Sequence, residues 1–216
     1  MSAEAVASEM TDLERRLRRA LAATRLDAPR PMSALELPLK LDKLVAHTLA
    51  GNLRPAAVLA PVIRRGAELS MLFTVRASHL RSHSGQISFP GGGRDDGDGD
   101  AVDTALREAQ EEIGLPPARV EVIGYLDDYP TLSRYRITPV VGIVHGAPEL
   151  AVDDNEVAGV FEAPLAFVLD PASFERRWMS RDGLNLPFFE LNWGAHRIWG
   201  ATAGMLWNLA QKVSAT

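Results

Sequence analysis

The chain has 216 residues, a net charge of −5 at pH 7 and no cysteine. Hydrophobic residues make up 46% and charged residues 24%, which is typical of a globular protein with a single main core. The composition excludes disulfides, thiolate nucleophiles and zinc–thiolate sites, and the acidic balance argues against a nucleic-acid partner.

Segments that would place the chain in a membrane or export it are missing from the sequence. No apolar run approaches the roughly 18 residues that a membrane-spanning helix needs. The N-terminus carries Glu4 and Glu9 and lacks the basic start and apolar block of a secretory signal. We therefore expect a cytoplasmic protein with no membrane partner.

Residues 1–50 are predicted to form a helical extension and a linker. Thr11 and Glu14 have the spacing of a capping box, and leucines recur at helical spacing after them, which predicts an amphipathic helix to about residue 23. Such a helix packs either on its own domain or on a partner subunit, so a homodimer is compatible with it. Prolines in residues 26–38 predict the linker.

Residues 51–216 are predicted to form one α+β domain. Short apolar or β-branched segments predict strands at 56–63, 69–75, 86–89, 120–126, 136–144, 157–161, 188–191 and 196–199. Helical patterns occur at 101–113, 164–168 and 203–212. Pro61 suggests that the first strand lies at an edge or ends there. Strands mixed with a few helices predict an α+β or α/β/α sandwich.

The helix at residues 101–113 has clear boundary signals. Asp100 is a suitable N-cap, and Gly114 is a suitable stop. Apolar residues at helical spacing predict its buried face, namely Val102, Leu106, Ala109 and Ile113.

The same helix carries a dense group of glutamates. Glu108 and Glu112 are four residues apart, so they share one face and repel each other by a few tenths of a kcal/mol. A divalent cation such as Mg²⁺ would turn this repulsion into attraction, because it prefers carboxylate oxygens. Arg107 is spaced to pair with Glu111, which leaves the other two carboxylates for metal. The alternative is an ordinary solvated helix face.

A glycine-rich loop, Phe89-Pro90-Gly91-Gly92-Gly93, precedes this helix. Glycines let the main chain approach a ligand closely and turn its amides or carbonyls toward it. A glycine loop followed by a glutamate-rich helix is typical of metal-assisted phosphate chemistry.

These residues resemble the Nudix box, G-x5-E-x7-R-E-U-x-E-E-x-G-U, where U is a bulky apolar residue. The second half of the box is matched by Arg107, Glu108, Glu111, Glu112, Gly114 and Leu115, with Ala109 as a small substitute for U. The first glycine of the box falls on Gly93. Its first glutamate falls on Gly99, so that position is not met, and Asp98 and Asp100 flank it.

A second motif resembles that of the coenzyme A pyrophosphatases of the Nudix superfamily, L-L-[TS]-x-R-[SA]-x3-R-x3-G-x3-F-P-G-G. The matching residues are Leu72, Thr74, Arg76, Ala77, Arg81, Gly85, Phe89, Pro90, Gly91 and Gly92. Only Phe73 departs from it, as one apolar residue for another. The two motifs abut in the order that this branch requires.

The resemblance implies a Nudix-type α/β/α sandwich and a pyrophosphohydrolase that depends on Mg²⁺ or Mn²⁺. The implied substrate is coenzyme A, and acyl forms are open, with 4′-phosphopantetheine and adenosine 3′,5′-bisphosphate as products. The implied metal ligands are Glu108, Glu111 and Glu112. The implied general base is Glu111 or Glu156, and Arg107 would orient the glutamates. The implied substrate-binding residues are Arg76, Arg81, Gly91 and Gly92.

Several alternatives remain open at this stage. Another diphosphate, such as ADP-ribose, NADH or a nucleotide sugar, would suit the same box. A non-catalytic Nudix module is a further alternative, although the intact glutamates argue against it. Arg76 and Arg81 could instead form structural ion pairs, and Glu156 could belong to a plain acidic loop. Tyr125, Tyr135 and Arg136 are candidates for an adenine or phosphate pocket, or for ordinary core and surface positions.

Overall fold

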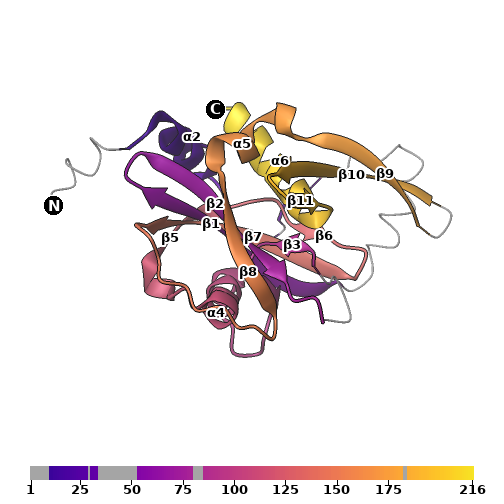
Figure 1. The fold of residues 1–216 in the computed structure, drawn as a ribbon, viewed down its shortest axis with the longest axis horizontal. Helices are drawn as coiled ribbons and strands as arrows, with labels where there is room; N and C mark the ends of the chain where they lie inside the picture. The colour runs from indigo at the N-terminus through magenta and orange to yellow at the C-terminus, as the bar shows by residue number, and fades with distance from the viewer. Residues whose placement is uncertain (1–9, 29, 34–52, 80–84, 182–183) are drawn as a thin grey trace.

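The computed structural model describes residues 10–28, 30–33, 53–79, 85–181 and 184–216. Its main element is a mixed, eight-stranded sheet with the order β3-β2-β1-β7-β5, in which β4 pairs with β1, β6 with β7 and β8 with β2 (Figure 1). The strands are β1 (Arg54–Arg65), β2 (Glu68–Arg76), β3 (Ile87–Ser88), β4 (Gly91–Gly93), β5 (Val120–Tyr125), β6 (Tyr129–Pro130), β7 (Tyr135–His145) and β8 (Val157–Pro164). The β1–β7 pair is parallel, and the other pairs are antiparallel.

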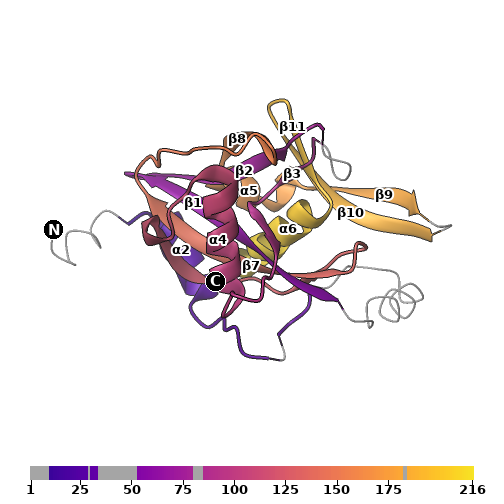
Figure 2. The same ribbon diagram turned by 90° about the horizontal axis from the view of Figure 1, so that it is seen from below.

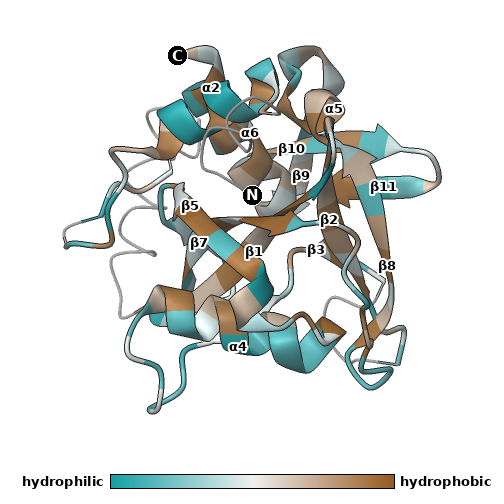
Figure 3. Ribbon diagram, turned by 90° about the vertical axis from the view of Figure 1, so that its left-hand side faces the viewer, coloured by the Kyte–Doolittle hydropathy of each residue, from teal (hydrophilic) through white to brown (hydrophobic). Residues whose placement is uncertain are grey.

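Helices cover both faces of this sheet (Figures 2 and 3). Helix α4 (Ala101–Ile113) packs on one face, and α2 (Asp12–Leu21), α5 (Leu165–Leu169) and α6 (Ala201–Ser214) pack on the other. Two short 3-10 helices, η1 (Pro117–Arg119) and η2 (Pro171–Ser173), also lie among the described residues. The predicted α+β sandwich is therefore confirmed.

Strand β1 shows why the sheet needs cover on both faces. Successive strand side chains point to opposite faces, and here both sets are apolar. Val58, Ala60 and Val62 join the core under α2 and α6, whereas Ala57, Leu59 and Ile63 join the core under α4. A strand that is buried on both faces belongs in the centre of a sheet.

The position of β1 makes the prediction from Pro61 wrong, because this proline lies inside a central strand. Leu59 donates its N–H to Pro90 on the side away from β7, at 2.9 Å. Two residues further on, the nitrogen of Pro61 faces that same side. The partner strands leave a gap there, since β4 pairs with residues 56–58 and β2 with residues 62–65. The missing N–H therefore removes no ladder bond.

Helix α2 packs on its own chain, which was one of the two roles predicted for it. The Thr11 side chain accepts a hydrogen bond from the amide of Glu14 at 3.1 Å, so the capping interaction forms. Leu17 and Leu21 are fully buried against the sheet and α6. The helix thus shares one hydrophobic core with the residues that follow position 50.

Helix α4 begins and ends as predicted. Asp100 accepts hydrogen bonds from the amides of Val102 and Asp103, and Gly114 ends the helix in the left-handed region at φ 67°. The fully buried face differs from the prediction, because Val102 and Leu106 are only partly buried. The buried residues of the helix are Thr104, Ala105, Ala109, Glu112 and Ile113. One of the glutamates therefore faces the interior.

A second sheet, with the order β11-β10-β9, extends from the main body in Figure 1. Its strands are β9 (Glu175–Arg181), β10 (Leu184–Trp193) and β11 (His196–Trp199). Strands at the positions of β10 and β11 were predicted, but β9 was not. Among the helices within the described ranges, none is both long enough and apolar enough to cross a bilayer.

Candidate active site

The glycine loop meets helix α4 at a very close approach. Strand β4 pairs with β1, so that Gly91 lies opposite Val58 and Gly92 opposite Ala57. A Cβ atom on Gly92 would lie 2.4 Å from Oε1 of Glu108, which no real side chain allows. Glycine at this position therefore lets a carboxylate of the helix lie directly on the main chain of the loop.

Glu108 and Glu112 form the acidic stripe that their spacing predicts. Glu112 is only 4% exposed and accepts a hydrogen bond from the amide of Gly91 at 3.3 Å. Burial raises the pKa of Glu112 to about 7, and the negative charge of Glu108 acts in the same direction. Burial also raises the pKa of Glu108. Two carboxylates are thus held together in a setting that penalises their charge.

Arg107 organises the outer side of this stripe. It donates to Glu111 at 2.9 Å, to Glu108 at 3.0 Å and to the carbonyl of Gly93 at 3.1 Å. The expected pair between Arg107 and Glu111 is therefore present. The side chain of Glu111 is 58% exposed, in contrast to the buried Glu112.

Asp98 pairs with Arg107. It lies beside Gly99, the position at which the Nudix box has its first glutamate. Its two oxygens accept hydrogen bonds from Nε and Nη2 of Arg107, at 3.1 and 3.0 Å. Asp98 also accepts one from the hydroxyl of Thr104, at 2.9 Å. The hydrogen bonds from Arg107 hold the pKa of Asp98 far below its usual range. The aspartates of residues 95–100 were interpreted from the sequence as a solvated turn that could help to recruit cations, and for Asp98 the solvated position is wrong, because it is only 8% exposed. The available signal was its place next to Gly99.

Arg76 and Glu156 approach the acidic stripe from the sheet. Arg76 ends β2 and pairs with Val157 at the start of β8, which places Glu156 beside it. The positive charge of Arg76 acts to lower the pKa of Glu112, while the charge of Glu156 acts to raise it. Nε of Arg76 is buried and has no hydrogen-bond partner among the residues whose positions are described. Arg81 lies outside the described residues.

The oxygen atoms of this site suit a divalent cation. Glu108 and Glu112 supply hard carboxylate oxygens in a largely buried place, where Arg107 contacts Glu108 and the charge of Arg76 acts on Glu112. Within the described ranges, no group of three or more His, Asp or Glu side chains is arranged to hold a metal ion. The turn of Glu111 toward Arg107 explains this. Glu108 and Glu112 are thus the pair that fits a cation, with any further ligand coming from elsewhere, and Glu111 as a ligand stays a prediction.

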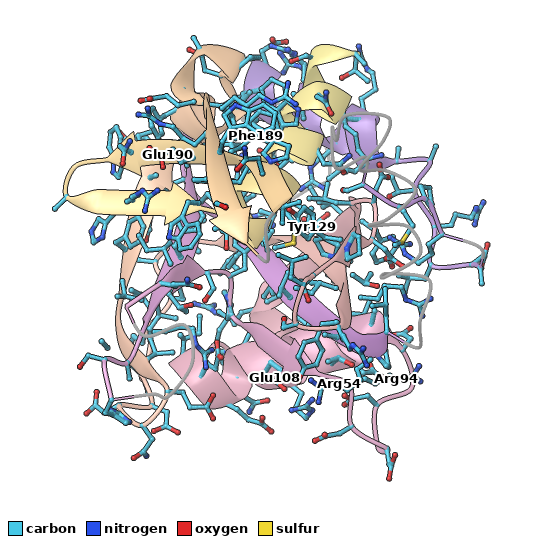
Figure 4. All side chains as sticks on the ribbon, turned by 90° about the vertical axis from the view of Figure 1, so that its right-hand side faces the viewer. Arg54, Arg94, Glu108, Tyr129, Phe189 and Glu190 are labelled. Carbon is cyan, nitrogen blue, oxygen red and sulfur yellow. The ribbon has the colours of Figure 1, made fainter. Side chains whose placement is uncertain are left out.

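A cavity of about 220 Å³ lies on the other face of the sheet, between α6 and β10. Its lining includes Tyr129, Phe189 and Trp207, and it includes no residue of the acidic stripe. Figure 4 shows Tyr129 and Phe189 well above Glu108. The acidic stripe of Glu108 and Glu112 therefore lies away from this cavity.

The sequence is similar to those of one known protein family. The family model described as NUDIX domain matches residues 53–194. The chain is 41% identical over 183 residues to the "Uncharacterized Nudix hydrolase NudL" of Yersinia pestis (strain Pestoides F), covering 83% of this chain and 90% of that protein. The protein of the same name from Yersinia pseudotuberculosis serotype I (strain IP32953) gives the same values.

Among solved structures, the chain is similar to "Crystal structure of a Nudix Hydrolase from M. Smegmatis, RenU", with 18% identity and a TM-score of 0.48, over 75% of this chain and 86% of that one. Nudix hydrolases generally use divalent ions such as Mg²⁺ or Mn²⁺ and bind small-molecule diphosphates. The chain belongs to the Nudix family and is a pyrophosphohydrolase that acts on phosphorus-containing anhydrides.

Proposed function

We propose that this chain cleaves the diphosphate of coenzyme A into 4′-phosphopantetheine and adenosine 3′,5′-bisphosphate. The observation that carries the proposal is Arg76, the arginine of the coenzyme A motif, which lies beside Glu112 with a buried and unpartnered Nε among the described residues. At the position where the chain departs from the motif, the ring of Phe73 stacks on that of the motif residue Phe89, with centroids 5.3 Å apart.

The residues of the site divide the work of diphosphate hydrolysis. Glu108 and Glu112 would hold Mg²⁺ or Mn²⁺, which when bound neutralises the charge on the phosphate oxygens and acidifies the attacking water. Arg76 would bind a phosphate oxygen, because its guanidinium group lies at the stripe and favours phosphate geometry. Gly92 lets Glu108 lie against the main chain of the loop, and Arg107 positions Glu108. Substrate contacts of Gly91 and Gly92 stay predictions from the motif. The role of Arg81 stays a prediction from the motif.

We assign the general base to Glu156 rather than to Glu111. Glu111 is already engaged by Arg107 at 2.9 Å, so accepting a proton would cost that ion pair. Glu156 is exposed, and it lies close enough to Glu108 and Glu112 for its charge to raise the pKa of both. Its main-chain carbonyl accepts from the amide of Ala77 at 2.9 Å, which fixes the loop beside the motif.

The test is a comparison of hydrolysis rates across a panel of diphosphates. The purified chain is incubated with coenzyme A, acetyl-coenzyme A, ADP-ribose, NADH and a nucleotide sugar, each with and without Mg²⁺. We expect Mg²⁺-dependent release of adenosine 3′,5′-bisphosphate from the coenzyme A compounds, measured by chromatography. A higher kcat/KM for ADP-ribose, NADH or the sugar nucleotide would contradict the assignment of the substrate.

A further inference from the structure

A second cavity, of about 160 Å³, lies at the N-terminal end of α4, on the same face of the sheet as the acidic stripe. Its lining includes three arginines, Arg30, Arg94 and Arg136, and two aspartates, Asp100 and Asp128. The charged groups that line it therefore leave one positive charge in excess. This is opposite in sign to the excess negative charge at Glu108 and Glu112.

Two of these arginines are available to a ligand. Arg30 is committed to the structure, because it pairs at 2.6 Å with Asp128, which is 2% exposed. Arg136 reaches Asp128 only at 3.6 Å and is 52% exposed. Arg94 is exposed and, within the described part of the chain, donates only to the main-chain carbonyls of Asp98 and Gly99.

The cavity lies a short distance from the acidic stripe along two separate elements. Arg94 follows Gly92 by two residues, and its amide still donates to Pro55 of β1, so about 7 Å of extended chain separates the two positions. On α4, Thr104 lines the cavity and Glu108 lies one turn further, about 6 Å along the axis. Figure 4 shows Glu108, Arg54 and Arg94 along the same lower edge of the molecule.

We propose that this arginine cavity, through Arg136 and Arg94, binds the 3′-phosphate of coenzyme A while its diphosphate lies at the acidic stripe. The inference rests on the proposed function. In coenzyme A the 3′-phosphate and the 5′-diphosphate are held one ribose apart, which is a separation of the same order as that between the two sites. Guanidinium groups bind phosphate oxygens in a planar, paired geometry, so they suit a phosphate monoester.

The cavity would therefore set substrate specificity. ADP-ribose and NADH have no phosphate at this ribose position and would leave Arg136 and Arg94 without a partner. Charge-assisted hydrogen bonds of this kind correspond to about 10- to 100-fold in binding. Coenzyme A and its thioesters share the 3′-phosphate, so the cavity would not distinguish among them.

The experiment compares coenzyme A with 3′-dephospho-coenzyme A, which differs only in the phosphate at issue. We measure kcat/KM on both substrates for the wild type, Arg136→Ala and Arg136→Gln, all in Mg²⁺. Arg119→Ala is the matched control, because Arg119 is exposed on η1, beyond the opposite end of α4. We expect both Arg136 variants to lose about 10- to 100-fold on coenzyme A and to stay within about twofold of wild type on the dephospho form. Arg119→Ala should change neither value.

The outcomes separate this inference from the proposed function. A wild type that cleaves other diphosphates but not coenzyme A would refute the proposed function itself. A wild type that cleaves coenzyme A, together with Arg136 variants that lose activity equally on both substrates, would overturn only the 3′-phosphate site. Stimulation of dephospho-coenzyme A cleavage by inorganic phosphate, lost in Arg136→Ala, would support the site, because the free anion would occupy the place of the missing 3′-phosphate.

Discussion

Two clusters of arginines and carboxylates in this chain differ in how their charges balance. One joins α2 to the sheet, where Glu14 lies between Arg18 at 2.9 Å and Arg64 at 3.1 Å. Arg18 also donates to both oxygens of Glu121, at 2.6 and 2.8 Å. The two glutamates are thus matched by two arginines. This balance is what a purely structural cluster needs.

The active-site cluster is not balanced in this way. Arg107 compensates Asp98 and Glu111 and also contacts Glu108. Glu112 is buried like Glu14, yet among the described residues the one charge that acts to lower its pKa is that of Arg76. The comparison indicates that an uncompensated buried carboxylate marks the functional site, because a cation from solution would supply the missing charge.

The largest expected effect comes from neutralising the two buried glutamates separately. Glu112→Gln should lower kcat by about 1000-fold, since a lost metal ligand removes several kcal/mol of transition-state stabilisation. Its unfolding temperature without metal should stay the same or rise. Glu14→Gln should instead destabilise the fold by about 3 kcal/mol, because it removes the buried negative charge that lies between Arg18 and Arg64. At temperatures well below that of unfolding, its kcat should equal that of the wild type.

These two variants are compared by steady-state kinetics on coenzyme A and by urea unfolding. A Glu112→Gln enzyme with wild-type turnover would remove the basis for the metal assignment. A Glu14→Gln enzyme with unchanged stability would show that charge balance does not separate the two clusters.

The next largest effect is expected at the contact between Gly92 and Glu108. Gly92→Ala would place a methyl group 2.4 Å from the Glu108 carboxylate and push it out of position. A displacement of about 1 Å at a reacting centre costs about 100-fold in rate. Gly97→Ala is the control, because its Cβ would meet no atom within 4 Å. Equal kcat values for the two variants would show that the position of Glu108 does not matter.

A smaller loss of activity, together with a loss of stability, is expected for Arg107→Ala. It would leave the buried Asp98 without its cation, which should cost about 3 kcal/mol in the free energy of unfolding. Turnover should fall by about 10- to 100-fold, as for other residues that orient metal ligands. Arg18→Ala should lose stability alone. A loss of turnover in Arg107→Ala but not in Arg18→Ala would support the distinction between the two clusters. Equal losses of turnover in both variants would contradict it.

The smallest expected effect is a pH dependence of the free energy of unfolding that arises from Glu121, in the cluster at α2. Hydrogen bonds from Arg18 lower the pKa of Glu121 from its ordinary 4.5 to about 2. A lowered carboxyl pKa adds stability above the unfolded pKa, and this stability is lost as the pH falls from about 4.5 toward about 2. Because Glu121 is 46% exposed, the size should be about 1 kcal/mol or less.

The free energy of unfolding of wild type and Glu121→Gln, measured by urea titration between pH about 6 and pH about 3, checks this sign. The variant should lose less stability than wild type over that interval. A steeper loss in the variant would mean that the ion pair does not persist in solution.

Much of the local structure could be predicted from the sequence because its determinants are local. Asp100 and Gly114 bound α4 through hydrogen bonds and backbone angles that depend on neighbouring residues alone. Strand β9 was missed because its segment, Glu175–Arg181, is mostly charged and exposed and lacks an apolar alternation. The prediction from Pro61 was wrong because the gap between β4 and β2 depends on two partner strands and cannot be predicted from the sequence of β1 alone.

In the candidate site, too, the features that depend on local spacing could be predicted, and those that depend on contacts between elements could not. The stripe of Glu108 and Glu112 and the pair between Arg107 and Glu111 depend on helical spacing, so the sequence predicts them. The burial of Glu112 and the pairing of Asp98 with Arg107 depend on how β4 and the acidic loop fold onto α4. Neither can be derived from spacing along one element.

Binding of Mn²⁺, measured by isothermal titration calorimetry in wild type, Glu112→Gln and Glu14→Gln with a non-hydrolysable diphosphate present, is the most direct test of the proposed charge imbalance. We predict saturable heat in wild type and in Glu14→Gln and none in Glu112→Gln. Equal binding in all three proteins would contradict the claim that the buried, uncompensated glutamate holds the cation.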